Sequence, residues 1–92
     1  MSKHHQPEWE SHGITVDTSI PTKVTFTFDR YVDHPTLGDL GRRLGAIRSG
    51  GTSHSQLHTG GMSTQAVFYL GSGVALSDDE IMSALRYAHI LG

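Results

Sequence analysis

Val24-Thr25-Phe26-Thr27-Phe28-Asp29 alternates large apolar side chains with polar ones. This period-two pattern is typical of a strand that is buried on one face only. Ile14, Val16 and Ile20 follow a similar, near-even spacing just before it. We therefore expect residues 14–20 and 23–32 to pair as antiparallel strands, with Pro21 and Thr22 in a turn that is looser than a two-residue hairpin.

Two helices are predicted after this pair of strands. Pro35 ends the second strand, because proline cannot donate a hydrogen bond to a ladder. Thr36 is then the candidate N-cap of a helix that ends at Ser49-Gly50-Gly51 and whose apolar side chains recur with helical spacing at Leu37, Leu40, Leu44 and Ile47. The capping box Ser77-Asp78-Asp79-Glu80 predicts the start of the second helix. Its apolar face consists of Ile81, Ala84, Leu85, Ala88 and Leu91.

Between the two helices, residues 65–70 are rich in β-forming side chains and predict a third strand. The order ββαβα predicts a small single-domain α+β fold: a three-stranded, mainly antiparallel sheet with two helices on one face. Residues 1–13 are mostly polar around Trp9, so we expect them to be a flexible N-terminal arm. Residues 14–92 then form the domain, with a Gly/Ser/His-rich loop at 49–63.

Composition narrows the function classes. The chain has 92 residues, which suffices for one domain, and a formal net charge of −2, which argues against nucleic-acid binding. It has no cysteine, and no apolar run approaches the ~20 residues of a membrane-spanning helix. We expect a cytoplasmic protein without a membrane partner. Because the predicted core is thin, we also expect a homo-oligomer that associates through a strand edge or the last helix.

The first predicted helix contains Gly38, Gly41 and Gly45 beside its apolar stripe. Each glycine costs roughly 1 kcal/mol relative to alanine in a helix interior, so their presence needs a reason. Close packing against another element is one explanation. The other is a ligand that lies against the bare backbone, where Arg42 and Arg48 would attract an anion.

The loop at 49–63 combines glycines, hydroxyls and two imidazoles, which could surround phosphate oxygens or sugar hydroxyls. It matches neither a Walker loop nor a dinucleotide fingerprint. His54 and His58 have the spacing of helical zinc ligands, but the glycines make a helix improbable and Ser55 stands where a metalloprotease has glutamate, so we predict no metal and no cofactor. The candidate ligand-binding residues are Gly41, Arg42, Arg48, Gly51, Thr52, Ser53, His54, His58 and Thr59.

Two functions fit this sequence. The first is a small non-enzymatic binding protein for an anionic or phosphorylated small ligand such as a nucleotide, which uses residues 50–63 and the nearby arginines. The alternative is a protein-interaction module, a small inhibitor or regulator, which uses an exposed strand edge, Trp9 and the outward-facing Tyr31 and Tyr69. No nucleophile motif is present, and the carboxylates at 78–80 are explained by capping, so we predict no catalytic residues and no enzyme.

Overall fold

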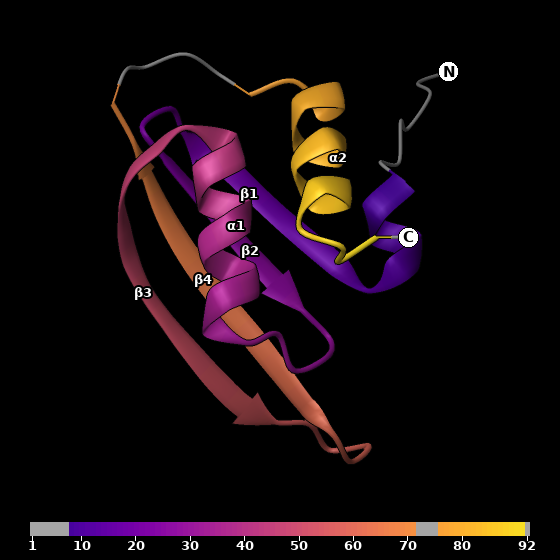
Figure 1. Ribbon diagram of the computed structural model, residues 1–92. Helices are drawn as coiled ribbons and strands as arrows, with labels where there is room; N and C mark the ends of the chain where they lie inside the picture. Colours follow the sequence, from indigo (N-terminus) through magenta and orange to yellow (C-terminus); the bar gives the residue numbers. More distant parts are fainter. Residues whose placement is uncertain (1–7, 72–75, 92) are drawn as a thin grey trace.

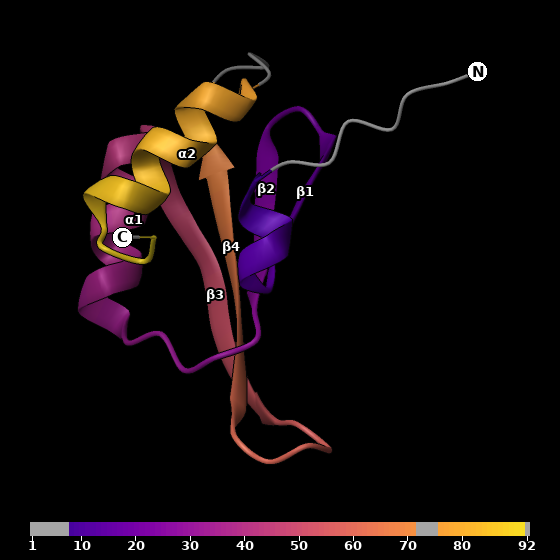
Figure 2. The ribbon, with the colours of Figure 1, turned by 90° about the vertical axis from the view of Figure 1, so that its right-hand side faces the viewer.

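The computed structural model of the protein describes residues 8–71 and 76–91. It is an α+β fold in which two helices cover one face of a four-stranded antiparallel sheet of order β1-β2-β4-β3 (Figures 1 and 2). The elements follow the chain as η1 (Glu8–His12), β1 (Ile14–Ile20), β2 (Lys23–Phe28), α1 (His34–Leu44), β3 (Ala46–Gln56), β4 (Met62–Leu70) and α2 (Asp78–Tyr87).

The core lies between the helices and the inner face of the sheet. On β2 the alternating residues Val24, Phe26 and Phe28 are all buried, as their period-two pattern predicts. Phe26 stacks on Phe28 and meets Phe68 of β4 edge to face. The helices add Leu37, Leu40, Ile81, Ala84 and Leu85 to the same cluster. The small α+β fold with two helices on one face of the sheet is thus confirmed.

The sheet has four strands, however, not the three that we predicted. The predicted loop at 49–63 is the source of the difference, because residues 49–56 belong to β3 and pair with β4. Met62 and Ser63 already belong to β4, so only the hairpin turn at 57–61 remains as loop. Most β3 side chains are exposed, and main-chain hydrogen bonds to β4 form the ladder without any need for buried side chains.

The first helix also begins and ends earlier than predicted. Its N-cap is Asp33, whose side chain accepts the main-chain N–H of Thr36 at 3.0 Å, so Thr36 lies inside the first turn. Gly45 takes a left-handed conformation with φ 79° and ends the helix. Ile47 is therefore not part of the helical stripe and is 68% exposed at a bulge of β3. The second helix begins at the predicted capping box of Ser77 and Glu80.

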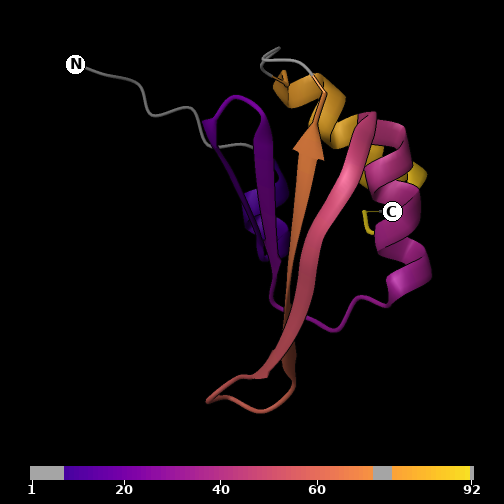
Figure 3. The ribbon, with the colours of Figure 1, turned by 90° about the vertical axis from the view of Figure 1, so that its left-hand side faces the viewer.

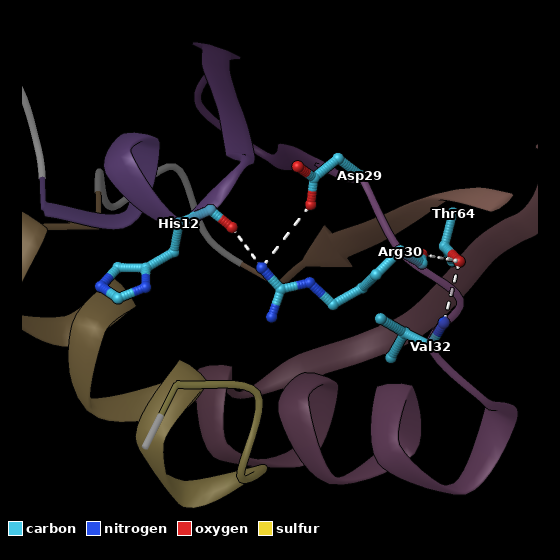
Figure 4. Close-up of polar contacts among 5 residues, drawn as sticks. All are labelled: His12, Asp29, Arg30, Val32 and Thr64. Carbon is cyan, nitrogen blue, oxygen red and sulfur yellow. Dashed lines mark hydrogen bonds and ion pairs between the residues drawn. The ribbon is translucent and has the colours of Figure 1, made fainter. Parts of the chain in front are cut away.

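Within the expected flexible arm at 1–13, residues Glu8–His12 form the 3-10 helix η1, and residues 1–7 lie outside the described part of the chain. Trp9 on η1 is 4% exposed and packs into the core cluster. Its large apolar surface favours burial more strongly than the polar residues around it favour solvent. Figure 4 shows how Arg30 holds this segment, through its guanidinium group on the His12 carbonyl oxygen and the Asp29 carboxylate.

Candidate functional site

Strand β3 forms one edge of the sheet, with β4 as its only neighbour in the strand order. It is 11 residues long, and none of these residues is buried. Figure 3 views the molecule from this side, where no described segment lies in front of the strand. The outer side of β3 thus faces solvent.

The hairpin turn shows which main-chain groups of β3 face outward. The Leu57 N–H donates to the Gly61 carbonyl oxygen at 3.0 Å, and the Gly60 N–H donates to the Leu57 carbonyl oxygen at 3.1 Å. In an antiparallel ladder, residues alternate between facing the neighbour and facing away. Because Leu57 faces β4, its alternate predecessors Ser55 and Ser53 do so as well. The N–H and C=O groups of Thr52, His54 and Gln56 point away from β4, and we call these three residues the open edge.

The open edge lacks the devices that usually protect an edge strand. Residues 49–61 contain no lysine, no other charged side chain and no proline. Natural edge strands are commonly blocked by such residues or by bulges. The two bulges of β3 lie before Thr52, between Ala46 and Arg48 and between Ser49 and Gly51. No charged residue, proline or bulge thus interrupts the regular segment 52–56.

An aromatic cluster borders the open edge at His54. The rings of Tyr31 and His54 stack with centroids 4.7 Å apart, and His34 meets His54 edge to face at 5.9 Å. The His54 Nε2 lies 3.1 Å from the Val32 carbonyl oxygen, which can only accept, so Nε2 carries the hydrogen. Tyr31 is 58% exposed and extends the apolar surface next to the edge.

The segment that carries this cluster is held by Thr64, the only buried polar residue among those described. Its hydroxyl donates to the Arg30 carbonyl oxygen at 2.9 Å and accepts the Val32 N–H at 3.0 Å (Figure 4). Thr64 is the register partner of His54 on β4. Thr64 on β4 and His54 on β3 thus both hydrogen-bond to residues 30–32, which cross from β2 to α1.

A pocket of about 250 Å³ lies between α1 and β3. We call it the α1–β3 pocket. It is lined by Gly38, Gly41, Arg42, Ala46, Arg48 and Phe68, together with Ser49. A side chain at Gly41 would meet the Phe68 ring at 2.8 Å, so close packing explains this glycine. A side chain at Gly38 would meet nothing within 4 Å, so this glycine leaves space open.

The two arginines of the pocket differ in their surroundings. Arg42 forms an ion pair with Asp39, one turn earlier on α1. The Arg48 guanidinium carbon lies 4.4 Å from the centroid of the Tyr69 ring. Tyr69 follows Phe68 on β4 and faces the opposite side of the sheet. No carboxylate among residues 8–71 and 76–91 pairs with Arg48, so its positive charge is not neutralised within the described chain.

The predicted ligand-binding residues lie in several places. Gly41, Arg42 and Arg48 meet at the α1–β3 pocket, whereas Gly51, Thr52 and Ser53 line a second pocket of about 290 Å³ along β3. His54 joins the aromatic cluster, while His58 and Thr59 are exposed in the hairpin turn. The structure thus separates the histidines from the arginines. The helix C-cap at Gly45 and the hairpin ladder, which set this arrangement, were not recognised from the sequence.

The structure also separates Tyr31 and Tyr69, which we expected to face outward together. Tyr69 faces outward beside Arg48, but Tyr31 lies beyond the end of β2 and stacks on His54 at the inner side, so the two tyrosines do not share a face.

Within the described chain, no group of three or more His, Asp or Glu side chains is placed to hold a metal ion. None of the described helices is long and apolar enough to cross a membrane.

No family model, no curated protein and no solved structure matches this chain.

Proposed function

We propose that this protein is a protein-interaction module that binds an extended segment of a partner chain as an additional strand along β3. The open edge is the observation that carries the proposal. Its outward N–H and C=O groups recur at every second residue, which is the spacing that another strand requires. The uncharged segment 52–56 presents no repulsive or proline-blocked position to such a strand.

The hydrogen bonds of the open edge can be compared with the free-energy cost of binding a partner segment. Three outward N–H and three outward C=O groups can make six hydrogen bonds, which contribute about 3–9 kcal/mol at a net value of about 0.5–1.5 kcal/mol each. Association costs about 4–15 kcal/mol of translational and rotational freedom. Main-chain pairing alone therefore gives weak binding, and useful affinity requires side-chain contacts beside the edge. The aromatic cluster and the α1–β3 pocket offer such contacts.

Amide hydrogen exchange tests this proposal through the alternation of the ladder. A peptide library displayed on phage is selected on the full chain, and an enriched peptide is synthesised. Its binding should slow exchange at Thr52, His54 and Gln56. The amides of Ser53 and Ser55 already donate to β4 and should change little. A library that yields no binding peptide, or protection that misses the open edge, would show that the proposal is wrong.

A variant pair and a concentration series complete the experiment. Gln56→Pro removes an outward N–H without touching the ladder to β4 and should weaken peptide binding about tenfold. Gln56→Ala keeps that N–H and should bind like the wild type. Sedimentation measures whether a second copy occupies the same edge. If the alternating protection appears with rising protein concentration and no peptide, the edge serves homo-oligomer formation instead, and the proposal fails.

A small anionic ligand is the second candidate function. It is favoured by the convergence of Gly41, Arg42 and Arg48 at one pocket. It has less support, because Arg42 is paired with Asp39 and the histidines lie elsewhere. Thermal unfolding with a nucleotide panel tests it, since a ligand at 100 times its Kd stabilises the fold by about 2.7 kcal/mol. Unchanged melting temperatures with every nucleotide would exclude this site for nucleotides.

A further inference from the structure

The α1–β3 pocket and the open edge lie along the same strand. Ser49 lines the pocket, and Thr52, the first residue of the open edge, comes three residues later. At about 3.3 Å per residue, the two are on the order of 10 Å apart. A segment that pairs with His54 and Thr52 in the antiparallel direction continues toward Ser49. Its next residues run past the bulge between Ser49 and Gly51, where regular pairing with β3 is interrupted, and reach the mouth of the pocket.

The side of the added strand that enters the pocket follows from the register. Thr52 and His54 pair with Ala66 and Thr64, which are buried under the helices. Residues directly opposite each other in a ladder project to the same face. The partner residues that pair with Thr52 and His54 therefore project to the helix side, and so does every second residue beyond them. In an extended segment, such a helix-side residue beyond Thr52 faces the same side of the sheet as the pocket.

The pocket lining selects the chemistry of that side chain. The Phe68 ring and the Ala46 methyl group provide apolar surface, and Gly38 leaves space open. Arg48 lines the same pocket, but its guanidinium group lies over Tyr69 on the opposite side of the sheet and has no carboxylate partner among the described residues. A residue next to the anchor projects to that opposite side, because the side chains of a strand alternate between its two faces. The lining thus complements one apolar side chain, and the charge complements an acidic residue next to it.

We propose, resting on the function proposed above, that the α1–β3 pocket holds one apolar side chain of the added segment and that Arg48 attracts an adjacent Asp or Glu. The partner is therefore an extended segment with an apolar anchor followed or preceded by an acidic residue. The main-chain pairing supplies binding to any extended segment, and the pocket supplies the choice among them. The anchor shares the helix-side face with the residues that pair with Thr52 and His54.

Gly38 offers a sharp test because its Cβ position is open. Gly38→Leu places an isobutyl group in the pocket region, whereas Gly38→Ala adds only a methyl group and serves as the matched control. Both variants are first compared with the wild type by circular dichroism and thermal unfolding. Peptides selected on the wild type should bind Gly38→Leu at least about tenfold more weakly and Gly38→Ala within about threefold. Library selection on Gly38→Leu should lose the preference for the apolar anchor.

Substitutions in the peptide and in the protein together identify which side chains contact each other. Replacing the anchor of a selected peptide by alanine should weaken binding to the wild type about tenfold, but should not weaken binding to Gly38→Leu further. Arg48→Gln should remove the preference for the acidic residue and leave the anchor preference intact. If Gly38→Leu binds the selected peptides as tightly as Gly38→Ala while Thr52, His54 and Gln56 are still protected, the pocket proposal is overturned and the strand-addition function stands. Loss of that alternating protection in the wild type overturns the function itself.

Discussion

Gly38 and Gly41 lie about one turn apart on α1, yet their surroundings differ. A Cβ at Gly41 would stand 2.8 Å and 2.9 Å from two carbons of the Phe68 ring, while a Cβ at Gly38 would meet nothing within 4 Å. Alanine gains roughly 1 kcal/mol over glycine through helix propensity, and overpacking typically costs about 1–3 kcal/mol. We expect Gly41→Ala to lower the free energy of unfolding by up to about 2 kcal/mol, and Gly38→Ala to raise it by about 1 kcal/mol. Urea unfolding measures both, and equal stabilisation by the two substitutions would contradict the close packing of Gly41.

Helix α1 depends on an N-cap that titrates. The side chain of Asp33 accepts hydrogen bonds from the Thr36 hydroxyl and the Thr36 N–H, which holds its pKa below the ordinary value of 3.8. The folded state therefore favours the ionised carboxylate. Its stabilisation is complete above the ordinary value and is lost as the pH falls through the lower pKa of the folded state.

Because the pKa of Asp33 is lower in the folded state, we expect the urea midpoint of the wild type to fall as the pH drops from about 5 to about 2.5. Asp33→Asn keeps a capping oxygen but cannot titrate, so its profile should be flatter in that window. The pKa of Asp17 is also lowered, chiefly by the Ser19 N–H, and Asp17→Asn serves as the control that removes only the β1 contribution. Identical profiles for the wild type and Asp33→Asn would show that the cap does not carry this dependence.

On the scale of the whole molecule, η1 closes the core through Trp9, the single tryptophan of the chain. Truncation of a buried tryptophan costs about 3–5 kcal/mol, which is a large part of the stability of a small domain. Trp9→Ala should therefore lower the free energy of unfolding by about 3–5 kcal/mol, as measured by urea unfolding followed by circular dichroism. Tyr87→Ala, at a side chain that is 54% exposed, should stay within about 0.5 kcal/mol of the wild type. Equal stability of the two variants would mean that η1 does not contribute to the core.

The local pattern of side chains was sufficient for part of this structure. The alternation at 24–28 determined which face of β2 is buried, and Ser77 with Glu80 determined where α2 begins. The residues predicted for the apolar face of α2 are all buried, although Ala88 and Leu91 follow the end of the helix at Tyr87. These features depend on residues within a few positions of one another, so they can be recognised without the fold.

Only the tertiary structure decided the rest. Thr36 could cap a helix as judged by residue type, but the chain enters α1 so that Asp33 reaches the first turn. Strand β3 has no periodic apolar pattern, because an edge strand is stabilised by main-chain bonds to its neighbour, and these are available to any residue other than proline. The meeting of Gly41, Arg42 and Arg48, and the separation of His54 from them, follow from the placement of α1 beside β3. Such long-range packing joins residues whose local sequence carries no trace of the contact.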